Sequence, residues 1–344
     1  MGAQRWHEQL EADARASLPE HVWRYFAAGA RDEVSLAESL TAWTDVRLWP
    51  HVLRDVRRPE TATSLLGTSL AQPLAIAPTS MQRLAHPDGE LAMARAAAEA
   101  GTLLVVSSNA GTAFAEIGAT GVSWWLQAYV TADRALIAST FGAAAAAGAR
   151  AIVLTVDTPV PGAKYDLDDE AFGDLSGIYG HNHPAVVRGE TPGAEHAQDL
   201  RAEDLQWLHE LTGLPVVVKG VLRGDDALRC LDAGAAAVWV SNHGGRQLDR
   251  AASTRAALPG VVAAVGDRAE VYVDGGIRSG LDVVTALALG ARGVFCGRTP
   301  LLALAAGGEE RVRSTLQILQ SEVVDALRLA GCSTLAETCS LTAP

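Results

Sequence analysis

The sequence is poor in three features that would each place it in a familiar class: paired cysteines, long apolar runs and excess positive charge. Its 344 residues include four cysteines, Cys230, Cys296, Cys332 and Cys339, without C-x-x-C spacing. A chain of this length does not need a disulfide scaffold, so we expect reduced thiols and a cytoplasmic location. No apolar run reaches about 18 residues, and residues 1–23 lack the apolar core of a signal peptide, so no membrane attachment is expected.

The balance of charges argues against a nucleic-acid partner. Lysines and arginines number 28 against 40 aspartates and glutamates, which gives a formal net charge of −12. Proteins that bind nucleic acid normally neutralise phosphates with a basic face. Any anion that this chain binds must therefore meet a local positive pocket. Hydrophobic residues make up 49% of the chain, which is enough to bury a large core.

Eight apolar runs of strand length alternate with alanine-rich stretches of helical length. The runs are 73–78, 103–108, 123–129, 151–157, 215–220, 236–242, 270–276 and 293–298, and helices are expected in stretches such as 89–101, 134–149, 204–213, 255–266 and 279–291. Repeated βα units predict a parallel sheet, and eight of them predict an α/β fold of the (β/α)8 TIM barrel type. We expect a single domain over residues 1–344, with the barrel at about 70–330 after an N-terminal helical extension.

Polar residues close every one of the eight runs, where a TIM barrel builds its active site. The last two closures, in DGGIRSG (274–280) and CGR (296–298), combine glycine with arginine. Glycine lets backbone N–H groups approach a phosphate, and a guanidinium donates paired hydrogen bonds to it. The sequence therefore predicts an active site at the carboxyl ends of the strands and a ligand that carries a phosphate.

Several motifs in their expected order resemble the FMN-dependent 2-hydroxy acid oxidase and dehydrogenase family. They are YFAAGARDEVSL, APTSMQRLAHPDGE, VDTP, VKGV, SNHGGRQLD and DGGIRSG, and the similarity extends from about Leu18 to Glu337. The resemblance implies FMN as cofactor and oxidation of an (S)-2-hydroxy acid to the 2-keto acid, with electrons passed to oxygen or another acceptor. It also implies a homo-oligomer, typically a tetramer.

The resemblance assigns a role to each matching residue. His243 matches the catalytic base, Asp157 the carboxylate paired with it, and Lys219 a positive charge beside the flavin. Arg246, Tyr25 and Tyr129 match residues that contact the substrate, the arginine through its carboxylate. The implied FMN contacts are Pro78, Thr79, Ser80, Ser107, Gln127, Thr155, Lys219 and Ser241 around the ring and ribityl chain, and Asp274, Gly275, Gly276, Arg278, Gly297 and Arg298 toward the phosphate.

Three positions depart from the family and leave the substrate open. Lys164 stands where a second substrate arginine is usual, and it keeps the charge without the bidentate fork. Asn109 occupies a position that is tryptophan in glycolate oxidase, and Ser80 one that is usually alanine or glycine. We interpret Lys164 and Asn109 as substrate-binding residues of a changed pocket. An FMN barrel that oxidises a non-standard relative of a 2-hydroxy acid is therefore an alternative.

The loop 165–196 is long for a compact domain, and we interpret it as a lid over the flavin. Its two histidines, His181 and His183, lack the further ligands that would complete a metal site, so no metal is expected. Two rival functions are a Schiff-base aldolase that uses Lys219 as nucleophile and a flavin-binding protein without catalysis. Neither explains His243, Asp157 and Arg246 together.

Overall fold

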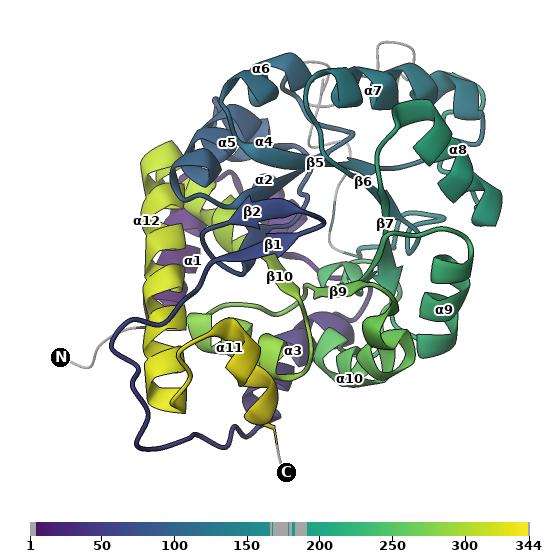
Figure 1. The fold of residues 1–344 in the computed structure, drawn as a ribbon. Coiled ribbons are helices and arrows are strands. Elements are labelled where there is room, and N and C mark those ends of the chain that lie inside the picture. The colour runs from purple at the N-terminus through teal and green to yellow at the C-terminus, as the bar shows by residue number, and fades with distance from the viewer. Residues whose placement is uncertain (1–4, 166, 168–177, 179–180, 183–190, 343–344) are drawn as a thin grey trace.

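Eight parallel strands close into a barrel in the computed structural model, which describes residues 5–165, 167, 178, 181–182 and 191–342 (Figure 1). The strand order around the barrel is β10-β3-β4-β5-β6-β7-β8-β9, so chain order is kept throughout. The strands are β3 (Leu74–Ile76), β4 (Leu103–Ser107), β5 (Ser123–Ala128), β6 (Ile152–Thr155), β7 (Val216–Val221), β8 (Ala237–Val240), β9 (Glu270–Val273) and β10 (Gly293–Cys296). The predicted (β/α)8 barrel is confirmed, and each strand coincides with one predicted run.

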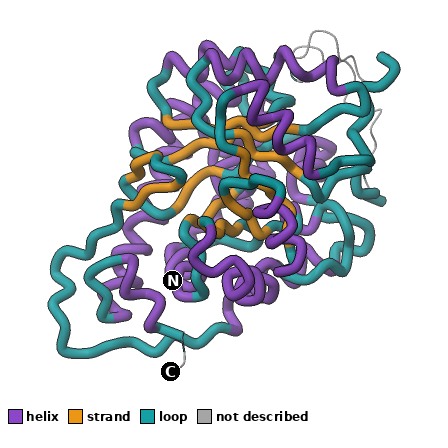
Figure 2. The backbone as a smooth tube through the Cα atoms, turned by 45° about the vertical axis from the view of Figure 1, so that its right-hand side comes forward, coloured by secondary structure: helices purple, strands orange, loops and turns teal. Residues whose placement is uncertain are grey.

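Helices surround the strands, which occupy the centre of the molecule (Figure 2). They are α4 (Gln82–Ala85), α5 (Gly89–Glu99), α6 (Phe114–Ala119), α7 (Arg134–Ala146), α8 (Ala202–Thr212), α9 (Gly224–Asp232), α10 (Thr254–Val265), α11 (Gly280–Ala288) and α12 (Arg298–Ala330). Capping residues in the sequence determine where several helices begin or end. Ser279 and Asp282, for example, form a reciprocal capping box at the start of α11. None of the described helices is long and apolar enough to cross a membrane.

Three helices precede the barrel, as the predicted N-terminal extension requires. They are α1 (Trp6–Ser17), α2 (Glu20–Ala27) and α3 (Val34–Thr41), followed by the 3-10 turn η1 (Ala42–Asp45). The first and the last part of the extension each contact the barrel. The Trp6 indole donates to Glu322 of α12, and the Trp43 indole donates to the carbonyl of Gly275 at 2.8 Å. The extension thereby reaches the loop after β9.

A short hairpin that the sequence did not predict closes the amino end of the barrel. Its strands, β1 (Thr63–Leu65) and β2 (Thr68–Leu70), are antiparallel. Leu65 packs against Gly293 at the start of β10, and the backbone N–H of Leu66 donates to Glu270 at the start of β9. The hairpin therefore covers the amino ends of β9 and β10.

The barrel interior is packed with aromatic side chains. Trp125, Trp239, Tyr272 and Phe295 are all fully buried, and the ring centroids of Trp239 and Phe295 lie 3.8 Å apart. Residues on the alternate face of each strand pack against the helices, as expected of a parallel sheet covered on both sides. The aromatic layer forms a floor beneath the carboxyl ends of the strands, where the predicted site residues lie.

Candidate active site

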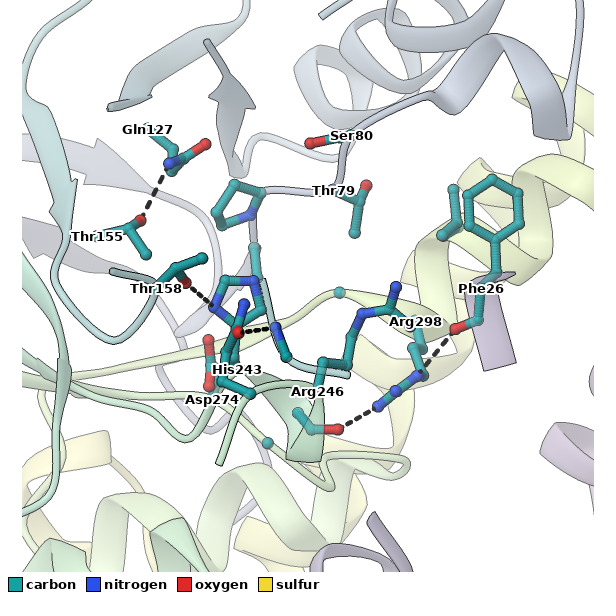
Figure 3. A pocket seen from close by; sticks show the side chains of 18 of the residues that line it. Phe26, Thr79, Ser80, Gln127, Thr155, Thr158, His243, Arg246, Asp274 and Arg298 are labelled. Carbon is teal, nitrogen blue, oxygen red and sulfur yellow. Dashed lines mark hydrogen bonds between the residues drawn. The ribbon is translucent and has the colours of Figure 1, made fainter. Parts of the chain in front are cut away.

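A cavity of about 550 Å³ opens at the carboxyl ends of the strands, and all eight strand ends contribute to its wall (Figure 3). Most residues predicted for the site line it: Tyr25, Pro78, Thr79, Ser80, Asn109, Gln127, Tyr129, Thr155, Lys164, Lys219, His243, Arg246, Asp274, Gly275, Gly276, Arg278, Gly297 and Arg298. Ser107, Asp157 and Ser241 lie behind the wall, and each is hydrogen-bonded to a lining residue. The barrel thus gathers in one place residues that are up to 273 positions apart (298 − 25 = 273).

His243 and Asp157 form a hydrogen-bonded pair from the ends of β8 and β6. The Nδ1 atom of His243 lies 3.0 Å from Oδ1 of Asp157, and Nε2 lies 3.4 Å from the Tyr129 hydroxyl. Because Asp157 accepts at Nδ1, the neutral ring carries its proton there and presents a lone pair at Nε2. Nε2 is therefore the basic atom on the cavity side of the ring.

Burial and charge set the protonation of this pair. Burial lowers the pKa of His243, although Asp157 acts in the opposite direction, so the imidazole is neutral near pH 7. Burial would raise the pKa of Asp157, but the neighbouring His243 and Lys219 outweigh it and bring the pKa to about 2. The pair is thus a neutral base beside a permanent carboxylate, which stabilises the ring when it accepts a proton.

The backbone at His243 adopts an unusual conformation. His243, Gly244 and Gly245 have φ values of 58°, 63° and 74°, a run in the left-handed region. A Cβ at Gly245 would lie 2.6 Å from the backbone nitrogen of Leu36, so glycine is needed there for space as well as for φ. The strained turn lifts the His243 ring out of the line of β8 and toward Asp157, which is consistent with a functional position.

Lys219 is a buried cation held in a network on the cavity floor. Its Nζ atom donates to the Ser241 hydroxyl at 2.9 Å and lies 3.5 Å from Asp274. Ser241 in turn donates to Asp274 at 2.7 Å, and its hydroxyl also accepts from the backbone N–H of His243. The Nζ atom lies 5.8 Å from the centroid of the Trp239 ring, so the aromatic floor contributes a cation–π contact.

A row of hydrogen-bonding side chains extends along the wall next to Lys219. The Ser80 and Ser107 hydroxyls lie 3.0 Å apart, and Ser107 donates to the Gln127 carbonyl oxygen at 3.1 Å. The Gln127 amide nitrogen then donates to Thr155 at 3.0 Å. These residues follow or end β3, β4, β5 and β6, so four adjacent strands offer one polar edge. Such an edge suits a flat heterocycle that carries donors and acceptors.

Three arginines, Arg246, Arg278 and Arg298, add positive charge to that of the two lysines in the cavity. Arg246 donates to the carbonyls of Tyr25 at 2.8 Å and Ala28 at 2.7 Å, and its guanidinium lies 5.2 Å from the centroid of the Tyr25 ring. Arg298 also reaches the extension, since it donates to Ala28 at 3.0 Å and to Phe26 at 3.2 Å. Carbonyls satisfy these donors without cancelling their charge.

Burial lowers the pKa of two of these arginines. It lowers the pKa of Arg278 and, together with the charges of Arg246 and Arg278, the pKa of Arg298. Among the described residues, no carboxylate lies within ion-pair distance of Arg246, Arg278 or Arg298. Half-buried cations without a carboxylate partner are expected where an anionic ligand completes the charge balance.

The loop after β9 and the start of α12 provide the backbone for such an anion. Gly275 and Gly276 have φ values of 91° and 79°, and a Cβ at Gly276 would collide with the Ser39 carbonyl. Helix α12 begins at Arg298, directly after Gly297, so its free N–H groups face the same end of the cavity. The two glycine–arginine segments predicted to hold a phosphate do come together.

The departures from the family pattern lie in the same cavity. Lys164 lines it and donates from Nζ to the Gly162 carbonyl at 3.0 Å. Asn109 also lines it, and its backbone N–H donates to Ser107. The predicted lid, 165–196, falls largely outside the described residues, as does His183.

Among the other residues of the wall, three carry polar side chains that the sequence did not single out: Thr158, His196 and Gln247. Thr158 and Gln247 lie inside the VDTP and SNHGGRQLD motifs, next to residues that were identified, so their position in the motifs was an available signal. His196 ends the long loop, and no local pattern marks it.

A neutral base with its carboxylate, a buried lysine and a cationic cradle on a TIM barrel fit an oxidoreductase that uses a phosphate-bearing cofactor. The chain belongs to the FMN-dependent dehydrogenase family, whose model matches residues 14–342. An L-lactate oxidase from Nostoc sp. is 42% identical over 96% of this chain and 94% of its own, and glycolate oxidase 3 from Arabidopsis thaliana is 40% identical over 96% and 93%.

Solved structures agree with the sequence relatives. A mandelate oxidase mutant with (S)-mandelic acid superposes with a TM-score of 0.89 at 38% identity, over 98% of this chain and 97% of the other. Mandelate oxidase with benzoylformic acid gives a TM-score of 0.89 at 39% identity, with the same coverage. The cofactor is FMN, and the site fits it, since the polar edge suits a flavin ring and the uncompensated arginines suit its phosphate.

Proposed function

We propose that this chain oxidises the hydroxyl-bearing Cα of an (S)-2-hydroxy acid to the 2-keto acid and passes the electrons to oxygen or another acceptor. The observation that carries the proposal is the neutral His243 base, paired with Asp157, in one cavity with the arginine Arg246. When bound, FMN supplies the acceptor for the hydrogen and the two electrons that leave Cα. The names of the relatives, which act on lactate, glycolate and mandelate, support this substrate class.

The substrate carboxylate binds to Arg246. Its guanidinium is held by the carbonyls of Tyr25 and Ala28, which fix the planar fork in place while leaving its charge intact. Lys164 lies on the same cavity and adds a second positive charge without a fork. Tyr25 and Tyr129 supply hydroxyls for further contacts with the substrate.

His243 removes the proton of the substrate hydroxyl. The lone pair at Nε2 accepts it, and the imidazolium that results remains paired with the Asp157 carboxylate at 3.0 Å. Lys219 places a buried positive charge on the cavity floor, where it stabilises negative charge that develops on a bound group. Asp157 and Lys219 therefore favour the charge-separated stage of the reaction.

The cofactor contacts follow from the positions of the lining groups. Residues Pro78, Thr79, Ser80, Ser107, Gln127, Thr155 and Ser241 are proposed for the ring and ribityl chain, and Asp274, Gly275, Gly276, Arg278, Gly297 and Arg298 for the phosphate end. The N-terminal extension and the barrel line one cavity, which supports treating residues 1–344 as one functional domain.

The aldolase alternative gains little from the structure. A Schiff-base lysine must attack a substrate carbonyl with its amine, but the Lys219 Nζ atom donates to Ser241 and lies 3.5 Å from Asp274, so it would have to give up both contacts to do so. A non-standard substrate remains the alternative that a specific observation favours, because Lys164 and Asn109 both line the cavity.

We also propose a homo-oligomer in the cytoplasm. Trp49, Val52 and Leu53 are 58%, 79% and 103% exposed on the segment before β1, and exposed apolar clusters of this kind mark contact surfaces. All four cysteines are free thiols, which supports a reducing compartment. Light scattering after size-exclusion chromatography gives the subunit number, and a monomer would overturn the proposed assembly.

The decisive experiment follows the visible absorbance of the FMN-loaded protein during anaerobic addition of a panel of 2-hydroxy acids. Bleaching by a panel member confirms the half-reaction, and rapid recovery of colour in air identifies an oxidase, whereas slow recovery identifies a dehydrogenase. A protein that binds FMN but is bleached by none of the panel would contradict the proposed substrate class.

A further inference from the structure

His196 occupies a fixed position beside the catalytic pair. The segment that carries it is bonded along its backbone to the residues that follow Tyr129: Ala132 donates to Glu195 at 2.8 Å, Asp133 to Gly193 at 2.9 Å and Ala197 to Val130 at 2.8 Å. Thr131 and His196 themselves form an antiparallel bridge. Backbone hydrogen bonds before and after His196 therefore hold its backbone in place, although the loop before it is long.

The ring of His196 is held as firmly as its backbone. It stacks on Tyr129 with ring centroids 4.6 Å apart and an interplanar angle of 13°. Its Nδ1 atom lies 3.0 Å from the carbonyl oxygen of Thr158. A carbonyl only accepts hydrogen bonds, so Nδ1 must carry the proton, and the neutral ring has its lone pair at Nε2.

The Nε2 atom is accessible and unused. Among the described residues it has no hydrogen-bond partner, and it is absent from the set of buried polar atoms that lack one, so a ligand can reach it. The residue lines the cavity. Burial lowers the pKa of His196, which keeps the ring neutral and Nε2 an acceptor near pH 7.

The position of this acceptor relates it to the substrate rather than to the phosphate end. His196 stacks on Tyr129, and the Tyr129 hydroxyl lies 3.4 Å from Nε2 of His243. The acceptor is thus one ring away from the base that receives the substrate proton. Asn109 and Lys164 line the same cavity and make it polar as well.

We propose that His196 is a specificity-determining residue whose Nε2 atom accepts a hydrogen bond from a donor on the substrate side chain. The inference rests on the proposed function and names the subclass: 2-hydroxy acids that carry a hydroxyl close to Cα. A site built to pair a donor rejects the analogue that lacks it, because the acceptor is left without a partner when the analogue displaces water.

Two substrate pairs and two variants test the proposal. (S)-Glycerate differs from (S)-lactate by a hydroxyl on Cβ, and (S)-4-hydroxymandelate differs from (S)-mandelate by a distant phenol. H196F keeps an aromatic ring to stack on Tyr129 but removes the acceptor, whereas H196Q loses the ring but offers an amide oxygen near the place of Nε2. The readout is the ratio of kcat/KM within each pair, measured on the FMN-loaded protein, with KM and kcat reported separately.

We expect the native protein to prefer glycerate over lactate by about 10-fold or more, as one well-placed hydrogen bond allows. H196F should lower this ratio by about 10-fold, mainly through the KM for glycerate, and H196Q should retain most of it. The ratio within the mandelate pair should change less, because the phenol hydroxyl of 4-hydroxymandelate lies farther from Cα than the Cβ hydroxyl of glycerate.

Other outcomes would overturn the inference. Equal losses for both members of a pair in H196F would show that His196 only supports Tyr129. A native protein that oxidises lactate or mandelate without preferring a hydroxylated partner would refute the specificity role and leave the proposed function standing. A native protein that no 2-hydroxy acid bleaches would overturn both.

Discussion

Replacing Asp157 with asparagine removes the charge beside His243 while keeping the size and one acceptor oxygen of the side chain. The two partners lie 3.0 Å apart and are 21% (His243) and 13% (Asp157) exposed. At an effective dielectric constant of about 20, opposite unit charges at this distance attract by roughly 5 kcal/mol. Asparagine retains a dipole, so we assign about half of this, ~3 kcal/mol, to the loss of imidazolium stabilisation.

A loss of ~3 kcal/mol corresponds to about a 100-fold slower reaction step. The assay is the rate of flavin bleaching by substrate under anaerobic conditions, because this rate isolates the step in which His243 accepts the proton. FMN content, measured from the absorbance spectrum, should be unchanged. Thr158→Val is the matched control, since it removes the 3.1 Å hydrogen bond to Asp157 but keeps the charge, and it should slow bleaching by less than about 10-fold.

The pH profile separates this role from a structural one. In the native protein kcat/KM falls as pH drops through the pKa of His243, because the protonated ring cannot act as a base. Asp157 raises that pKa against the effect of burial, so D157N should move the acid limb of the profile to lower pH. Bleaching within about 3-fold of the native rate, together with an unmoved acid limb, would refute the reasoning.

Three further predictions use other residues of the cavity. His243→Ala should keep FMN bound but lower turnover by about 100-fold or more, as expected for loss of a general base, and near-normal turnover would exclude that role. Arg246→Lys and Lys164→Ala should each raise KM more than they lower kcat, because both charges line the cavity and are proposed to bind the substrate carboxylate, and an unchanged KM in both variants would place the carboxylate elsewhere. Arg278→Gln should weaken FMN binding by roughly 10-fold to 100-fold in a fluorescence titration of the apoprotein, since a charge-assisted hydrogen bond contributes about 1.5 to 3 kcal/mol, and unchanged affinity would remove Arg278 from the phosphate site.

The barrel could be predicted because its signal is local and repeated. Each strand is a short apolar run, and each is separated from the next by a stretch long enough for a helix. The residues at which the strands end were less predictable. The sixth predicted run continued to Asn242, but β8 ends at Val240, because the backbone leaves the extended region at Asn242 (ψ 25°) and His243 (φ 58°). Function rather than apolar patterning determines that turn.

From apolar patterning alone, the site could be predicted only where it follows the strands, whereas Tyr25 and Lys164 were identified through the family resemblance. Lys219, His243 and Asp274 are placed by the barrel, so a residue at a strand end is already a residue of the cavity. The sequence did not predict His196 as a site residue, because its position depends on backbone hydrogen bonds to residues 130–133, and a loop sequence does not indicate such pairing. The β1–β2 hairpin was not predicted either, because two runs of three residues show too little periodicity to be recognised as strands.

The carbonyl groups that hold the arginines were invisible to sequence reasoning, yet they explain how an acidic chain can bind anions. With a net charge of −12, carboxylates are abundant enough to neutralise every guanidinium. Arg246 and Arg298 are instead held by the carbonyls of Tyr25, Phe26 and Ala28. A neutral acceptor fixes the geometry of a guanidinium but leaves its charge for the ligand. A carboxylate would accept the hydrogen bonds and also neutralise the charge. The N-terminal extension therefore leaves the charges of Arg246 and Arg298 for anionic ligands, and we propose that these are the carboxylate of the substrate and the phosphate of the cofactor.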